Sequence, residues 1–348
     1  MALKLADTSW KFTDNREWRE HFTKWPPVII SCAITGGIHG KSANPNLPET
    51  PEEQADSTYE AYKAGCSIVH IHARDPNTNF ATQSERAEDF YKSNHLIRER
   101  CPDIIINNTG TPAFSTDDEE EMTKHFAECN PEVASLDVGM LYMRFKIKYP
   151  DEMIKTMGGA QGIKAIGKAR GVIMDLQADN RVLWEGVIPL GYSKTEKLSR
   201  AMRASNIKPE LEVFNSQSWW FVDNLIDRKL IDPPYWCQLV FGQDGACSPP
   251  TIMTAMDMID NMPPQSLFSA IGIGPLQLPV NALSLIMGGH IRVGMEDNVY
   301  YRRGELAKSN AQQVERAVRI VHELNREVAT PAQAREMLGI SQTPKQYP

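Results

Sequence analysis

The chain has 348 residues, which is enough for one large α/β domain or two ordinary ones. Its hydrophobic fraction of 41% and charged fraction of 23% are ordinary for a soluble globular enzyme. A net charge of −7 argues against nucleic acid as a main partner, because binding to phosphates requires a basic surface.

Signals for export or membrane insertion are missing from the sequence. The first residues lack the continuous apolar core of a signal peptide, and no apolar run approaches the roughly 20 residues that span a bilayer. The six cysteines contain no C-x-x-C pair, which is typical of reduced thiols packed as small hydrophobic residues. We therefore expect a cytoplasmic protein without a membrane partner.

Short runs rich in β-branched residues alternate with longer helical patterns along the whole chain. The predicted strands cover residues 28–34, 67–73, 104–107, 133–137, 211–214, 236–241, 267–271 and 290–293. The predicted helices lie near residues 51–64, 84–100, 116–129, 195–205, 217–227, 250–261, 277–287 and 308–325. Eight β/α units in succession favour a single (β/α)₈ TIM barrel over a doubly wound sheet. The Thr35-Gly36-Gly37 turn is too short for the glycine fingerprint of a dinucleotide-binding fold.

Three segments lie outside this repeat, so we expect a catalytic barrel over residues 26–330 with additions. Residues 1–25 form an N-terminal extension with Trp10, Trp18 and Trp25, predicted to pack as a helix across the barrel bottom or onto a neighbouring subunit. Residues 331–348 form a C-terminal tail.

A long insertion is predicted after strand 4, at about residues 145–193. Within it, two apolar runs flank Asp179-Asn180, which is typical of a hairpin turn. Connections of this length are uncommon and often functional, and we expect either a lid or a subunit contact.

The most informative stretch is Ile68-Val69-His70-Ile71-His72-Ala73-Arg74. Alternation along a strand places His70, His72 and Arg74 on one face. Two imidazoles in this arrangement can bind one metal ion, and zinc is the usual occupant. Two hydrogen-bonded structural histidines and a salt-bridged arginine are the alternative.

A second polar cluster covers strand 8 and the loop after it, GGHIRVGMEDNVY at residues 288–300. Barrel closure places strand 8 beside strand 1, so only one strand separates the tops of strands 2 and 8. Glu296 can therefore reach His70 and His72. Two histidines and one carboxylate with an open fourth position are typical of a catalytic zinc site.

Further candidates lie at the same end of the barrel. Asp297 can contact Arg292 through two hydrogen bonds, either as a catalytic pair or as a structural ion pair. Glu212 on strand 5 is a catalytic or supporting candidate, because a carboxylate that points into a barrel is costly unless it is used. Ser135 and Asp137 share one face at the top of strand 4.

Two small turns could bind an anion such as a carboxylate through their backbone N–H groups. They are Thr35-Gly36-Gly37 after strand 1 and Thr109-Gly110-Thr111 after strand 3. Ordinary glycine-rich connections between strand and helix are the alternative. We group these turns with Arg74 as candidate substrate-binding residues.

Together, the motifs ITGG, NPNLPETPEE, AGCSIVHIHARDP, LEVF, IMGGHIRVGMEDNVY and LAKSN resemble the β-keto acid cleavage enzyme family over about residues 28–340. The resemblance implies a (β/α)₈ barrel, often tetrameric, that condenses a β-keto acid with acetyl-CoA to give acetoacetate and a new acyl-CoA. It also implies one Zn²⁺ per chain bound by His70, His72 and Glu296.

The same resemblance assigns roles to other residues. Arg292 and Asp297 match the catalytic pair, and Thr109 and Ser135 match hydroxyls that hold the substrate or intermediates. Because a guanidinium is a poor base, we expect the base to be Asp297 or a relay through Arg292.

Two positions depart from the family pattern. Ile38 stands where an amino-selective relative has an acid, and Gly274-Pro275-Leu276 stands where an arginine is often found after strand 7. We therefore expect a substrate without an amino group, with Trp219 and Trp220 either lining the acyl pocket or packing against the barrel. A zinc hydrolase, a class II aldolase and a non-catalytic metal-binding protein are the alternatives.

Overall fold

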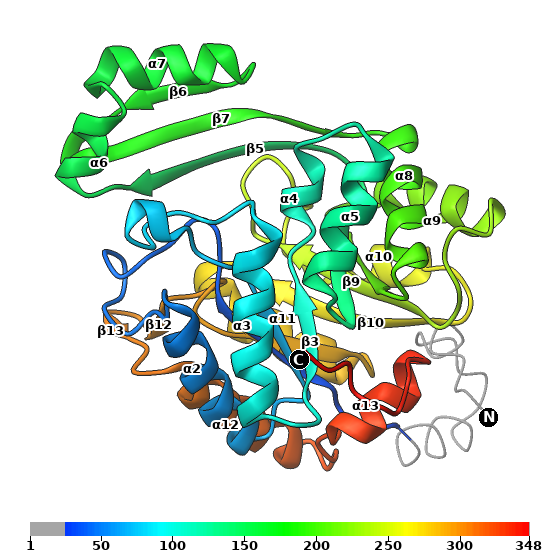
Figure 1. Ribbon diagram of the computed structural model, residues 1–348. Helices are drawn as coiled ribbons and strands as arrows, with labels where there is room; N and C mark the ends of the chain where they lie inside the picture. Colours follow the sequence, from blue (N-terminus) through cyan, green and yellow to red (C-terminus); the bar gives the residue numbers. More distant parts are fainter. Residues whose placement is uncertain (1–24, 348) are drawn as a thin grey trace.

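The computed structural model describes residues 25–347, and its centre is a closed barrel of eight parallel strands (Figure 1). Around the barrel the strands follow chain order, and the last pairs with the first. They are β1 (Ile30–Thr35), β2 (Ile68–Ile71), β3 (Ile105–Asn108), β4 (Val133–Asp137), β8 (Lys208–Val213), β9 (Tyr235–Phe241), β10 (Ser266–Gly272) and β11 (His290–Val293). The predicted (β/α)₈ barrel is confirmed.

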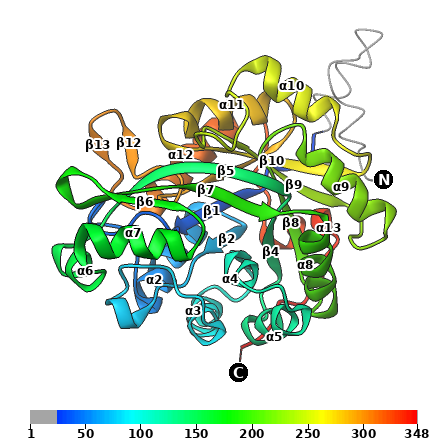
Figure 2. The same ribbon diagram turned by 90° about the horizontal axis from the view of Figure 1, so that it is seen from above.

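Helices cover the outside of the barrel between successive strands (Figure 2). They are α2 (Pro51–Ala64), α3 (Ala87–Arg100), α4 (Thr111–Phe114), α5 (Glu119–Cys129), α8 (Tyr192–Ala204), α9 (Ser218–Asp227), α10 (Ile252–Asp260), α11 (Gln277–Ile286) and α12 (Asn310–Glu323). Apolar strand residues such as Ile30, Cys32 and Ile34 face outward and pack against them, for example against Ala61 of α2. Among the described residues, no helix is long and apolar enough to cross a membrane.

The predicted strand boundaries agree with the structure to within about three residues. The largest difference is in β8, which begins at Lys208 rather than at residue 211. Lys208, Pro209 and Glu210 carry no β-branched signal, and Pro209 would ordinarily argue against a central strand. Pairing with β4 and β9 on either side nevertheless holds this segment extended.

The insertion after β4 is larger than predicted, because it begins at residue 139 and not near 145. It contains β5 (Gly139–Lys148), α6 (Asp151–Thr156), α7 (Gly159–Ala169), β6 (Ile173–Leu176) and β7 (Arg181–Leu190), with the antiparallel strand order β5-β7-β6. The predicted hairpin is confirmed, since Asp179 and Asn180 both take φ of 57° between β6 and β7. Only Val138 separates β5 from β4, so the sequence offers no break at which to place the boundary.

The paired strands β5 and β7 extend across the end of the barrel where the strands have their C-termini (Figures 1 and 2). At the base of this ribbon, Leu141 packs with Phe214, Val240 and Ile271 from the strands and loops below it. The insertion is therefore fixed to the barrel end that carries the predicted site.

The opposite end of the barrel is closed by apolar residues and by the short helix α13 (Pro331–Leu338). Ala334 and Leu338 of α13 pack against the first inward residues of the strands, including Ile29 and Trp236. The predicted C-terminal tail thus contributes to the barrel core. Trp10 and Trp18, predicted to lie across this end, are outside the described residues, whereas the Trp25 ring lies beneath the Arg326 guanidinium at 5.0 Å.

A buried ion cluster joins α3, α13 and the C-terminal segment at the same end. Glu132, which is 4% exposed, accepts from Arg98 at 2.9 Å and from Arg335 at 2.6 Å. It also accepts from the backbone N–H groups of Ile106 and Lys345. A single carboxylate therefore balances two buried guanidinium groups.

We expect Glu132→Gln to lower the free energy of unfolding by about 3 kcal/mol, because it leaves two buried guanidinium groups without a counter-charge. Urea unfolding of the purified protein measures the change. Glu60→Gln is the matched control, since its pair with Lys63 is exposed and its loss should leave the free energy of unfolding nearly unchanged. Equal effects of the two substitutions would contradict the prediction.

Candidate metal centre

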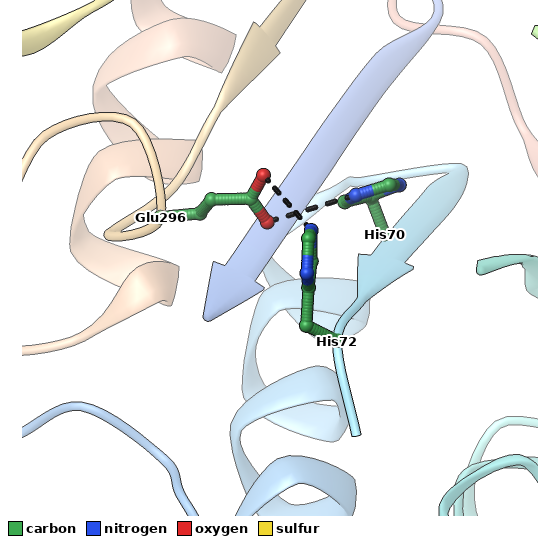
Figure 3. A group of neighbouring side chains, drawn as sticks. All are labelled: His70, His72 and Glu296. Atoms are coloured by element: carbon green, nitrogen blue, oxygen red, sulfur yellow. Dashed lines mark ion pairs between the residues drawn. The ribbon is translucent and has the colours of Figure 1, made fainter. Parts of the chain in front are cut away.

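His70, His72 and Glu296 meet at the C-terminal end of the barrel (Figure 3). His70 lies on β2, His72 follows it, and Glu296 lies in the loop after β11; β1 pairs with both strands. A tight turn at Gly294, with φ of 130°, brings this loop back over β1. There the Glu296 N–H donates to the Ala33 carbonyl at 3.1 Å, which directs the glutamate toward the histidines.

The spacing of these three side chains fits a metal ion. Glu296 Oε2 lies 3.7 Å from His70 Nε2, and Glu296 Oε1 lies 3.4 Å from His72 Nε2. All three ligand atoms lie within 4.8 Å of one another. Metal–ligand bonds of about 2.1 Å in tetrahedral geometry place neighbouring ligand atoms about 3.4 Å apart. The observed separations match such a site.

The protonation states also favour a cation between the three groups. Burial lowers the pKa of His70 to about 3, so its ring is neutral. His72 Nδ1 contacts Gln83 Oε1 at 2.5 Å, which makes Nδ1 the donor and leaves the lone pair on Nε2. In this tautomer Nε2 of His72 faces the Glu296 carboxylate and could bind a cation placed between them.

Gly36 and Gly37 lie directly against the ligands. A Cβ added at Gly36 would lie 2.5 Å from Glu296 Cγ, and one at Gly37 would lie 2.5 Å from Gln83 Oε1. The turn after β1 therefore needs glycine so that the backbone can approach the ligands. Anion binding by these two residues stays a prediction.

Arg74 fastens the loops around the site. Its guanidinium donates to the carbonyls of Gly36 at 2.5 Å, Phe80 at 3.1 Å and Ala81 at 2.8 Å. Glu49 provides its counter-charge at 4.0 Å, and the Arg74 side chain is 0% exposed. These contacts give Arg74 a role in holding the loops after β1 and β2, and contact with a substrate stays a prediction.

Arg292 is the electrostatic partner of the acidic loop. Its Nε and Nη2 donate to the two carboxylate oxygens of Asp297, both at 2.9 Å. Nη2 also donates to Glu296 at 2.5 Å. Nη1 is buried without a hydrogen-bond partner, 3.7 Å from Glu212 Oε1, and so remains available as a donor.

Three further carboxyl groups near Arg292 have perturbed pKa values. Burial raises the pKa of Asp297 to about 6, although the Arg292 charge opposes the rise. Burial also raises the pKa of Asp137 to about 6, and burial with the Asp137 charge raises that of Glu212 well above its usual range. Asp137 and Glu212 are paired in register on β4 and β8, and their carboxyl groups hydrogen-bond to each other.

The predicted hydroxyl residues surround the same end of the barrel. Ser135 Oγ accepts from the Gly110 N–H at 3.1 Å, and Thr109 Oγ1 lies 2.7 Å from Thr111 Oγ1. Thr35 Oγ1 is buried without a hydrogen-bond partner. Their contact with a substrate stays a prediction.

Sequence reasoning missed two residues that contact the histidines. Gln83 lies in the loop between β2 and α3, where no periodic pattern marks it. Asn107 pairs with His70 across β2 and β3, so its side chain lies next to the ring. A signal for Asn107 did exist, since an amide at an inward position of a buried strand needs a partner.

Most of the chain is similar to known proteins. Residues 27–340 match the family model described as "beta-keto acid cleavage enzyme". The 3-keto-5-aminohexanoate cleavage enzyme of Acetoanaerobium sticklandii is 33% identical over 90% of this chain and 98% of its own length. The 3,5-dioxohexanoate:acetyl-CoA acetone transferase of Paraburkholderia graminis is 31% identical over 90% and 96%. The 3-dehydrocarnitine:acetyl-CoA trimethylamine transferase of Rhizobium meliloti is 29% identical over 90% and 97%.

Among solved structures, the ternary complex of ObcA with a C4-CoA adduct and oxalate has a TM-score of 0.56 at 19% identity. The similarity covers 85% of this chain and 68% of ObcA, and it supports the barrel fold. The family match extends over nearly the whole described chain and includes the HxHxR and GGHIRVGMEDN segments that form the site. The chain therefore belongs to the β-keto acid cleavage enzyme family.

Proposed function

We propose that this protein is a zinc-dependent acyltransferase that condenses a β-keto acid with acetyl-CoA to give acetoacetate and a new acyl-CoA. The observation that carries the proposal is the His70–His72–Glu296 triad with the Arg292–Asp297 pair beside it. Relatives named for transfer to or from acetyl-CoA support the transferase class.

The ligand set fits zinc. Two neutral imidazole nitrogens and one carboxylate, with a fourth position left open, are typical of catalytic zinc and rare in calcium or magnesium sites. His70, His72 and Glu296 would hold the ion. When bound, it would act as a Lewis acid on the carbonyl group of the β-keto acid.

Asp297 is the residue that we propose as the base. Its raised pKa lies close to neutrality, where a carboxylate both accepts a proton and releases it readily. Arg292 cannot serve well in this role, because a guanidinium holds its proton at any physiological pH. Its two hydrogen bonds to Asp297 instead fix the direction in which the carboxylate faces.

Glu212 and Asp137 would supply a second proton. Two buried carboxyl groups that share a hydrogen bond share one proton, because like charges at this distance disfavour double ionisation. Glu212 also lies 3.7 Å from the unpaired Nη1 of Arg292. We propose that Glu212 donates this proton to the negatively charged acyl oxygen of the tetrahedral intermediate and regains it when the carbonyl group re-forms, while the Thr109 and Ser135 hydroxyls stabilise the same oxygen.

The insertion would limit the access of water to this chemistry. The paired strands β5 and β7 cross the barrel end that carries the site (Figure 2). Tyr149 follows directly after β5. Burial raises the pKa of its hydroxyl group, and the positive charges of Arg170 and Arg74 oppose the rise. The insertion therefore comes near Arg74, which holds the loops of the site. We propose a cover over the site, which is one of the two roles, a lid or a subunit contact, expected from the sequence.

The loop after β1 favours a substrate without an amino group. Residues 36–48 contain no acid, and Glu49 is already bound to the Lys41 N–H at 2.7 Å and to Arg74. Ile38 and His39 are half-buried beside this loop, so no carboxylate is free to neutralise an ammonium group. Relatives named for amino, trimethylammonium and dioxo substrates are 29–33% identical to this chain, so identity alone does not select among these substrates.

The aromatic pocket expected from the sequence is not part of this proposal. Trp219 is 4% exposed and packs in the core between the strands and the helices, whereas Trp220 is 70% exposed on α9. The bulk of the acyl chain would therefore contact other residues.

We expect His70→Ala and His72→Ala each to remove most of the bound zinc, because two remaining protein ligands hold the ion weakly. Elemental analysis of the purified variants measures the metal content. His322→Ala is the control, since His322 is exposed on α12 and should leave the metal content unchanged. Full zinc occupancy in both ligand variants would overturn the assignment.

Arg292→Lys should retain zinc and the fold but lower kcat/KM at least about 100-fold, because lysine cannot make a planar two-point contact with Asp297. Steady-state kinetics and metal content are measured on the same preparation. Arg302→Lys is the control, because its ion pair with Glu305 is at the surface. Turnover within about twofold of the parent would show that the Arg292 pair is only structural.

The parent should prefer 3-oxopentanoate or 3-oxohexanoate over 3-keto-5-aminohexanoate by at least about tenfold in kcat/KM, because a buried ammonium group would be unpaired. Ile38→Glu should shift this ratio toward the amino substrate, and Ile38→Gln, which adds no charge, should not. If the parent already favours the amino substrate, Ile38 does not determine specificity.

A further inference from the structure

The barrel interior below the candidate metal centre is polar, although a TIM barrel is usually filled with branched apolar residues. Beneath His70 and above the apolar layer that contains Ile29 and Trp236, the strands point polar side chains inward. These buried residues are Ser31, Asn107, Glu210, Gln238, Ser269 and His290. Burying polar groups at this depth is unfavourable unless they hydrogen-bond to one another or to a ligand.

Glu210 is the charged member of this layer and is 0% exposed. Its Oε2 accepts from Asn107 Nδ2 at 2.7 Å, and its Oε1 accepts from Trp236 Nε1 at 2.8 Å and from Gln238 Nε2 at 3.3 Å. Every one of these partners is a donor. Burial raises the pKa of Glu210, and the hydrogen bonds from Asn107 and Trp236 oppose that rise by favouring the ionised form.

Asn107 connects this carboxylate to the metal ligand His70. Because Nδ2 of Asn107 is held by Glu210, its carbonyl oxygen Oδ1 is the atom left to face elsewhere. Asn107 and His70 are paired in register on β3 and β2, so their side chains lie next to each other on the inner face of the barrel. Asn107 Oδ1 and His70 Nδ1 are both buried without a hydrogen-bond partner, and as acceptor and donor each can satisfy the other.

We propose that Asn107 and Glu210 are positioning residues that fix His70 as the Nδ1–H tautomer, with Nε2 directed at the metal. Glu210 orients the Asn107 amide, and the amide oxygen accepts the Nδ1 proton of His70. Outer contacts of this kind also raise the basicity of the ligating nitrogen. The inference rests on the metal site of the proposed function but not on its substrate or reaction.

A parallel contact at the second histidine supports this assignment. His72 Nδ1 bonds to the Gln83 amide oxygen at 2.5 Å, so both histidines present Nε2 to the same point. His72 is partly accessible, with a side chain that is 12% exposed, whereas that of His70 is 2% exposed. Water can help to orient His72 but cannot reach His70. The orientation of His70 therefore depends on the Asn107 amide, which is in turn held by the Glu210 carboxylate.

Asn107→Leu tests the proposal, with Gln238→Leu as the matched control. Both replace a buried amide that donates to Glu210, but only Asn107 contacts His70. We expect Asn107→Leu to lower zinc affinity about 10- to 100-fold in chelator competition, and Gln238→Leu to change it by less than about threefold. Urea unfolding of the metal-free proteins separates this effect from a general loss of stability.

Glu210→Gln provides a second variant of nearly unchanged size. The new amide must turn its NH₂ group toward one of the donors that Glu210 now accepts from, so Asn107 loses its fixed orientation. We expect zinc affinity to fall by a smaller factor than in Asn107→Leu. Imidazole nitrogen NMR shifts of the metal-free parent should show His70 protonated at Nδ1, and both Asn107→Leu and Glu210→Gln should weaken that preference.

The outcomes separate this inference from the proposed reaction. If the parent binds zinc but does not form acetoacetate, the reaction is wrong and the positioning role stands. If zinc affinity falls equally in Asn107→Leu and Gln238→Leu, or if His70 is protonated at Nε2 in the parent, the positioning role is overturned. It is also overturned if the parent binds no metal.

Discussion

The pairing of β1 with both β2 and β11 is the constraint on which the site depends. It closes the barrel and brings two segments more than two hundred positions apart within the reach of one ion. Parallel strands end at the same side of a sheet, so His70 and the loop that carries Glu296 emerge at one end. The Gly294 turn and the glycines after β1 let the backbones approach closely enough for the ligands to meet.

Burial determines the electrostatics of this end of the barrel. It keeps His70 neutral, raises the pKa of Asp297 and Asp137 to about 6, and raises that of Glu212 well above its usual range. In a medium of low polarity every charge needs a partner, and Arg292 supplies one for both Glu296 and Asp297. The same rule holds at the opposite end, where Glu132 balances two arginines.

The candidate metal ligands and the segments proposed to select the substrate lie in separate parts of the fold. The ligands and the residues behind them lie on strands and on tight turns, which hold side chains rigidly. The loop after β1 and the insertion β5–β7 lie at the same end of the barrel but outside its strands. One barrel can thus keep its chemistry while its loops change the substrate.

The sequence by itself determined the order of the eight β/α units, because strand and helix periodicities are local properties of the chain. It also determined the face shared by His70 and His72, and the reach of Glu296, because barrel closure leaves one strand between them. Where the local signal was weak it gave the wrong boundary, as at Lys208 in β8 and at Gly139 in β5. Only the tertiary structure identified Gln83 and Asn107 as partners of the histidines, paired Asp137 with Glu212 and placed α13 across the barrel bottom. These contacts depend on register, on side-chain direction and on which buried polar atoms lack another partner, none of which is encoded in a local pattern.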